Sequence, residues 1–141
     1  MNQLPISNGT VFLDMNGVRA ARGISADKVN ELVESGELLW VFNVAQAHGG
    51  NHPRNLRFWL PEIVDARAVS QLSLDTVISK ILPPGRSAIN GAEIGRWFLV
   101  SRPTVKHIGE KLGGAVKNQL LHVGRDALVR WLRQRWIGGS I

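Results

Sequence analysis

The dipeptide Pro83-Pro84, followed by Gly85, is the feature that most limits how this chain can fold. No helix continues through two prolines, and the residue before a proline is also driven out of the helical region. The preceding segment, residues 73–82, has apolar residues at helical spacing and Ser73 as an N-terminal cap, which predicts a short helix. We therefore expect structured units on both sides of this break.

The residues before the break predict a first unit over residues 1–70. Asp14 and Ser25 are suitable N-caps for two short helices, and Gly36 is suited to the left-handed turn that ends the second one. Two apolar runs then predict a hairpin, with a long polar, glycine-rich loop between its strands. The expected elements are helices over residues 15–22 and 26–35, strands over residues 38–44 and 56–60, and a closing helix over residues 62–69.

The residues after the break repeat this order in a second unit over residues 87–141, with residues 71–86 as the connector. Ser25 aligns with Ser101 and Val29 with Val105 at one constant offset, which suggests an internal duplication. The expected elements are helices over residues 91–98 and 102–112, a very short hairpin over residues 115–123, and a closing helix over residues 125–136. Two helices, a hairpin and a helix predict a mainly α fold with short β-hairpins, in which tandem winged helix-turn-helix units are joined by a short helix.

Positive charge is concentrated in the second half of the chain. The whole chain carries a formal net charge of +6. Residues 1–70 contain six Lys or Arg and seven Asp or Glu, whereas residues 71–141 contain eleven and four. Such an asymmetry is typical of proteins that hold a polyanion, although a charge that only maintains solubility is the alternative.

Two motifs in the second unit resemble a known family. Residues 99–105 (LVSRPTV) and residues 122–128 (HVGRDAL) are similar to the excisionase-type branch of the MerR-like winged-helix proteins, and the resemblance covers most of this unit. It implies binding to double-stranded DNA in recombination control, phage or mobile-element regulation, or antitoxin repression. In the first unit, Ala26 stands where the second unit has Arg102, which is a departure from the pattern.

The helix over residues 102–112 is the candidate recognition helix. With Val105, Ile108 and Leu112 on its inner face, it presents mainly hydrogen-bond donors outward. Arg102 has the fork that pairs with guanine, and Lys106 can reach a base edge or a phosphate. A basic, solvated helix face is the alternative. The DNA-binding candidates of this unit are Ser101, Arg102, Thr104, Lys106 and His107 on the helix, Lys117, Asn118 and Gln119 at the hairpin tip, and Arg125 at the start of the closing helix.

The first unit offers weaker candidates for DNA contact. Lys28, His52, Arg54 and Arg57 can follow a phosphate backbone if the long loop acts as a wing. The exposed face expected for the second helix is acidic, with Asp27, Glu31 and Glu34, and therefore suits a protein partner better than DNA. His48 and His52 are spaced as on one face of a helix, but the intervening glycines exclude a helix, so we expect no metal site.

These features together predict a non-enzymatic DNA-binding protein without cofactors. Double-stranded DNA is the expected partner, with a homodimer or cooperative assembly on DNA, and a recombinase or toxin as a protein partner. An excisionase, a recombination directionality factor or a transcriptional regulator of a bacterial mobile element or phage fits the pattern. The alternative is an interaction adaptor, antitoxin-like or part of a packaging or recombination complex; the C-terminal Trp136-Ile137, if exposed, would suit such a contact or a dimer. The absence of cysteine, of long apolar runs and of a signal peptide predicts a cytoplasmic, nucleoid-associated protein without a membrane partner.

Overall fold

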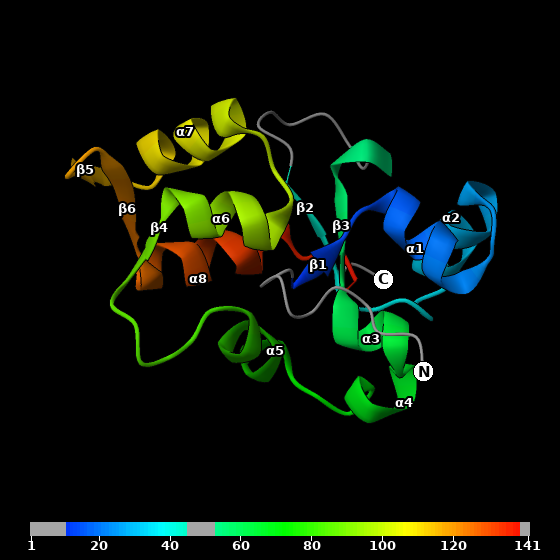
Figure 1. Cartoon of the computed structure of the whole chain (residues 1–141). Helices are drawn as coiled ribbons and strands as arrows, with labels where there is room; N and C mark the ends of the chain where they lie inside the picture. Colours follow the sequence, from blue (N-terminus) through cyan, green and yellow to red (C-terminus); the bar gives the residue numbers. More distant parts are fainter. Residues whose placement is uncertain (1–10, 45–52, 139–141) are drawn as a thin grey trace. The chain divides into compact units, whose positions relative to one another are not determined.

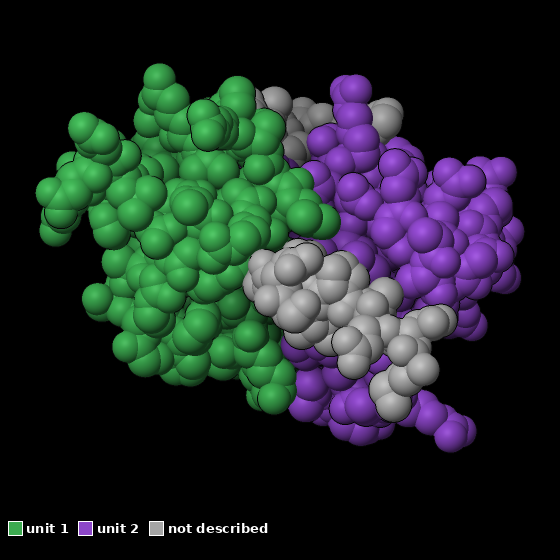
Figure 2. Space-filling view, in the orientation of Figure 1, with its two compact units in different colours: residues 1–11, 73–134 green, residues 12–72, 135–141 purple. Residues whose placement is uncertain are grey.

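The structure is a computed structural model, and it describes residues 11–44 and 53–138. Contacts divide the chain into two compact units, which Figure 2 colours separately. Unit 1 comprises Met1–Val11 and Ser73–Gln134, and so contains most of the second unit predicted from the sequence. Unit 2 comprises Phe12–Leu72 and Arg135–Ile141, and so contains most of the predicted first unit. Each unit contains one small antiparallel sheet of three strands together with its helices.

Unit 2 begins with a strand, two helices and a hairpin (Figure 1). Its sheet has the order β1-β3-β2, so the strand that precedes the helices pairs with the second strand of the hairpin. The elements are β1 (Phe12–Leu13), α1 (Met15–Arg22), α2 (Ala26–Glu34), β2 (Val41–Asn43), the short 3-10 helix η2 (Pro53–Asn55), β3 (Leu56–Trp59), α3 (Leu60–Val64) and α4 (Ala66–Val69).

Unit 1 repeats this order after one additional helix. Its sheet has the order β4-β6-β5, which is equivalent to the order in unit 2. The elements are α5 (Leu74–Ile81), β4 (Ala88–Asn90), α6 (Gly91–Phe98), α7 (Arg102–Lys111), β5 (Ala115–Lys117), β6 (Leu120–Gly124) and α8 (Arg125–Arg135), of which the last residue belongs to unit 2. The mainly α content with short hairpins is as expected from the sequence.

The offset between Ser25 and Ser101 is kept from the first strand of each unit to the start of the second helix. The same offset separates the starts of β1 and β4, of α1 and α6, and of α2 and α7. It also relates Gly23 to Leu99, and both residues end the first helix in the left-handed conformation, with φ of 64° and 53°. The two units therefore share their topology and their local backbone geometry, well beyond the two residue pairs noticed in the sequence.

Side-chain caps explain where the paired helices begin. Asp14, Ser25, Asn90 and Ser101 each accept a hydrogen bond from a backbone N–H in the first turn of the helix. Glu93 completes a capping box at α6 by accepting from the Asn90 backbone N–H at 3.1 Å. Each cap of this kind stabilises its helix by about 1 kcal/mol, and the capping serines predicted from the sequence are confirmed.

Several elements differ from their predicted extents. The closing helix of unit 2 is split at Asp65, whose extended backbone (φ −151°, ψ 90°) ends α3 and whose side chain caps α4. The strand predicted over residues 38–44 is confined to β2, because the Glu62 side chain, rather than a strand partner, binds the backbone N–H groups of Leu39 and Trp40. The short strands β1 and β4 were not predicted at all.

The unit boundaries also differ from those expected. Helix α5, expected as a connector, is part of unit 1, where Asp75 forms an ion pair with Arg133. The C-terminal residues were expected to belong with residues 87–134, but they belong to unit 2, together with Phe12–Leu72. There, Trp136 stacks on Trp40 with ring centroids 5.3 Å apart and donates its indole N–H to the Leu39 carbonyl at 2.8 Å. The expectation of an exposed aromatic tail is therefore wrong: Trp136 is held by the core of unit 2.

Each unit has its own apolar core. In unit 2, Phe12 and Phe42 meet edge to face, with centroids 5.5 Å apart, and both are fully buried. In unit 1, Phe98 of α6 stacks on Trp131 of α8 at 5.7 Å. These contacts fix α6, and with it the neighbouring helix α7. Within the described ranges, no helix is both long and apolar enough to cross a bilayer.

Candidate nucleic-acid interface

Helix α7 presents a polar, largely cationic face to solvent. Arg102, Pro103, Lys106 and Glu110 are exposed and His107 is half-buried, whereas Val105, Ile108 and Gly109 are buried. This is the orientation that the apolar spacing predicted, apart from Leu112, which is half-buried. Arg102 and Lys106 stand at positions i and i+4, so both lie on the same side of the helix, one turn from each other.

The start of α7 is held by two hydroxyl groups. Ser101 Oγ accepts the Thr104 backbone N–H at 3.4 Å and lies 3.1 Å from the Thr104 hydroxyl. Pro103 in the first turn has no N–H that would need a partner. The two predicted site residues Ser101 and Thr104 thus serve the cap of the helix that begins at Arg102.

A tight hairpin lies beside α7. Strands β5 and β6 are joined by Asn118 and Gln119 alone, and both have positive φ, 52° and 65°. Two consecutive residues of this kind form the type I′ turn that matches the twist of a hairpin. Lys117, Asn118 and Gln119 are all exposed, so the predicted hairpin tip is formed by the residues expected.

A groove of about 880 Å³ lies between α6, α7 and the hairpin. Gly109 permits the close approach of α7 and β6 at this groove, because a Cβ at that position would lie 2.5 Å from Leu121 Cδ2. The groove has an apolar part, to which Val100, Val105, Val116, Leu120 and Leu121 contribute, and a charged part with Arg96, Arg102, Lys106 and Glu110.

Arg96 is a site residue that sequence reasoning missed. It is exposed on α6 and lines the same groove as Arg102 and Lys106. The outward orientation of Arg96 could have been predicted from the sequence, because Arg96 falls between Ile94 and Phe98, which are the buried residues of that helix. The cations around the groove therefore come from two helices rather than one.

Arg125 has a structural role that the sequence did not reveal. Its Nε and Nη2 both donate to the Leu82 carbonyl, at 3.2 and 3.0 Å, and the side chain is half-buried. It thereby ties the start of α8 to the end of α5. Because these donors are already used, we do not retain Arg125 as a phosphate contact.

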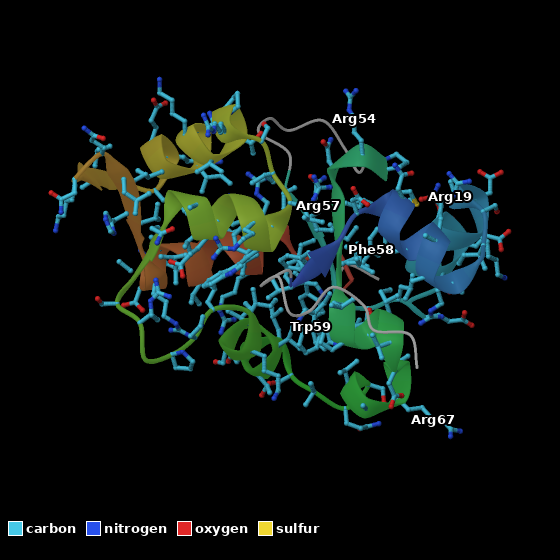
Figure 3. The ribbon with its side chains drawn as sticks, viewed as in Figure 1. Arg19, Arg54, Arg57, Phe58, Trp59 and Arg67 are labelled. Carbon is cyan, nitrogen blue, oxygen red and sulfur yellow. The ribbon has the colours of Figure 1, made fainter. Side chains whose placement is uncertain are left out.

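The candidates in unit 2 are not gathered on one surface. Lys28 is exposed but pairs with Glu31 at 3.4 Å, and α2 also exposes Asp27 and Glu34. Arg54 extends outward beside β3, and Arg67, a cation that was not among the candidates, extends from α4 at the opposite end of the unit (Figure 3).

Two further candidates in unit 2 are bound or not described. Arg57 Nη1 donates to the carbonyls of Arg54 and Leu56, both at 2.9 Å, so it supports the local chain. Burial lowers the pKa of Arg57, and the nearby Asp14 opposes this shift. The predicted candidate His52, like His48, lies outside the described residues. Unit 2 therefore presents a mixed surface rather than a cationic one.

The excess of positive charge lies entirely in unit 1. Unit 1 contains ten Lys or Arg and four Asp or Glu, and unit 2 contains seven of each. Two acids of unit 1 are neutralised by arginines: Glu93 by Arg86 and Asp75 by Arg133. The Arg86 hydrogen bond also lowers the pKa of Glu93. The surface of unit 1 is thus dominated by cations.

Among residues 11–44 and 53–138, no three or more His, Asp or Glu residues are placed to hold a metal ion. The arrangement on unit 1 can instead bind an anion, through two cations one helical turn apart, a third on α6 and a fourth at the hairpin tip. A comparison of the chain with protein-family models, with curated proteins and with solved structures finds no match.

Proposed function

We propose that this protein binds double-stranded DNA through unit 1, which acts as a winged helix-turn-helix. Helix α7 enters the major groove, and the tip of the β5–β6 hairpin lies against the neighbouring backbone or minor groove. The observation that carries the proposal is the pair Arg102 and Lys106, exposed one turn apart at the capped start of α7 and flanked by the hairpin. Burial or scattering of these two side chains would have removed its basis.

The roles of individual residues follow from their positions. Arg102 reads a guanine through its two parallel donors, and Lys106 contacts a base edge or a phosphate. Arg96 and Lys117 neutralise phosphates on either side, from α6 and from the hairpin. Asn118, Gln119 and His107 lie beside these cations and add neutral hydrogen bonds. DNA binding of this kind suits an excisionase-like recombination factor or a transcriptional regulator of a phage or mobile element, located with the nucleoid in the cytoplasm.

Titration of the full chain against duplex DNA tests the proposal. Arg102→Ala should weaken binding to a preferred duplex by about 1–3 kcal/mol and relax the preference at one base pair. Arg130→Ala is the matched control, because Arg130 is an exposed arginine of the same unit on α8 and does not line the groove. Equal loss of affinity for all sequences would assign Arg102 to the backbone, and equal effects of both variants would contradict the proposed interface.

A second candidate function is a protein-interaction adaptor. It is favoured by α2, which occupies the position equivalent to α7 but exposes Asp27, Glu31 and Glu34. Such a face repels phosphate and attracts a basic protein surface. An adaptor would leave random duplex DNA unretarded at micromolar protein in low salt, whereas the DNA-binding proposal requires retardation under these conditions.

A further inference from the structure

The groove of unit 1 is lined by apolar side chains as well as by cations. Val116 is 71% exposed on β5, and it is one of two large hydrophobic side chains with high exposure among the described residues. Val100, Leu120 and Leu121 line the same groove and are only half-buried. Exposed apolar surface bordered by polar residues is typical of protein-binding sites.

The charges around this apolar surface are arranged asymmetrically. Arg102 and Lys106 lie along the first two turns of α7, and Arg96 lies on α6, whereas Glu110 lies near the C-terminal end of α7. An occupant must therefore carry acidic groups about one helical turn apart, next to an apolar strip. These are the properties of an acidic amphipathic helix, and helices of this type bind in grooves through anchors at helical spacing.

We propose that the groove between α6, α7 and the β5–β6 hairpin binds an acidic amphipathic segment of a partner protein, and that this segment competes with DNA. The inference rests on the proposed function, because Arg96, Arg102 and Lys106 would serve both ligands. The carboxylates of the segment replace the DNA groups at these cations, and its apolar residues cover Val116 and Leu120, which DNA leaves exposed. A partner of this kind would release the protein from its DNA site.

The test uses a fluorescein-labelled helical peptide of about 18 residues, with leucines along one face and glutamates at its edges. A permuted peptide of identical composition, without an apolar face, is its control. We expect the full chain to bind the first peptide about tenfold more tightly than the second, and an unlabelled duplex to displace it. Equal binding of both peptides would reduce the interaction to charge alone and overturn the inference.

Two matched valine variants separate this inference from the proposed function. Val116→Thr keeps the shape and the strand preference but makes the groove more polar, and should weaken peptide binding about fivefold while leaving duplex affinity within about twofold. Val64→Thr, at the other exposed valine (57%, on α3 of unit 2), should change neither. Unaltered peptide binding by Val116→Thr would refute the groove as the site while DNA binding stands. Peptide binding without any duplex binding would refute the proposed function and the competition together.

Discussion

Glu62 provides the most demanding test of how unit 2 is held together. Its side chain is 3% exposed, and its two carboxylate oxygens accept the backbone N–H groups of Trp40 at 2.9 Å and Leu39 at 3.0 Å. In Glu62→Gln, the amide NH₂ faces one of these donors, so one N–H group loses its acceptor. We expect a loss of about 1–2 kcal/mol in the free energy of unfolding at neutral pH, and about 3 kcal/mol for Glu62→Ala, which removes both acceptors.

The effect of Glu62→Gln should also depend on pH. Burial raises the pKa of Glu62 above its ordinary value of 4.5, and the Leu39 and Trp40 hydrogen bonds and the charge of Arg22 only partly oppose this. The folded state therefore binds this proton more tightly than the unfolded state. The resulting stabilisation is fully present below the unfolded pKa and is lost as the pH rises through the folded pKa. Because glutamine does not titrate, the stability of the wild type relative to Glu62→Gln should fall with rising pH.

Urea unfolding followed by circular dichroism between about pH 4 and 7 measures both effects. Glu37→Gln is the control, because Glu37 is an exposed acid of the same unit. The reasoning is refuted if Glu62→Gln is as stable as the wild type at neutral pH, or if the difference between them does not change with pH.

Three further substitutions probe the geometry of each unit. Gln119→Gly should stabilise the protein by about 0.5–1 kcal/mol, because glycine accepts the positive φ of 65° without strain; an unchanged midpoint in urea would contradict this. Gly109→Ala should cost about 1–3 kcal/mol, since the added Cβ overlaps Leu121, and an unchanged thermal midpoint would show that the hairpin moves away at no cost. Trp136→Ala should cost about 3 kcal/mol through loss of its stacking on Trp40, whereas a truly exposed tail would give no change in the unfolding midpoint.

The sequence contained the local determinants of the fold. Capping residues such as Ser25 and Ser101 act within a few residues of their own position, and the inward face of α7 follows from spacing alone, so both could be predicted. Strands β1 and β4 could not, because they are too short to carry an alternating pattern, and their pairing partners β3 and β6 lie far along the chain, beyond two intervening helices.

What sequence reasoning missed depends on contacts between distant residues. Arg125 looks like an ordinary surface cation, and only the approach of Leu82, 43 residues earlier, gives it a structural role. Trp136 looked exposed at the chain end, but it bonds to Leu39, 97 residues away. The close approach of Leu121 to Gly109, which packs β6 against α7, likewise could not be predicted from residue spacing.

The salt dependence of duplex binding tests the central claim most directly. Four cations, Arg96, Arg102, Lys106 and Lys117, surround the proposed interface, and each phosphate neutralised contributes about −0.9 to the slope of log affinity against log salt. Arg96 and Lys117 are assigned to phosphates and Arg102 to a base, so we predict a slope of about −1.8 for the wild type, or about −2.7 where Lys106 also meets a phosphate. Lys117→Ala should make the slope shallower by about 0.9, and Lys80→Ala, at an exposed lysine on α5, should leave it unchanged. A slope near zero, or equal slopes for wild type and Lys117→Ala, would contradict the account.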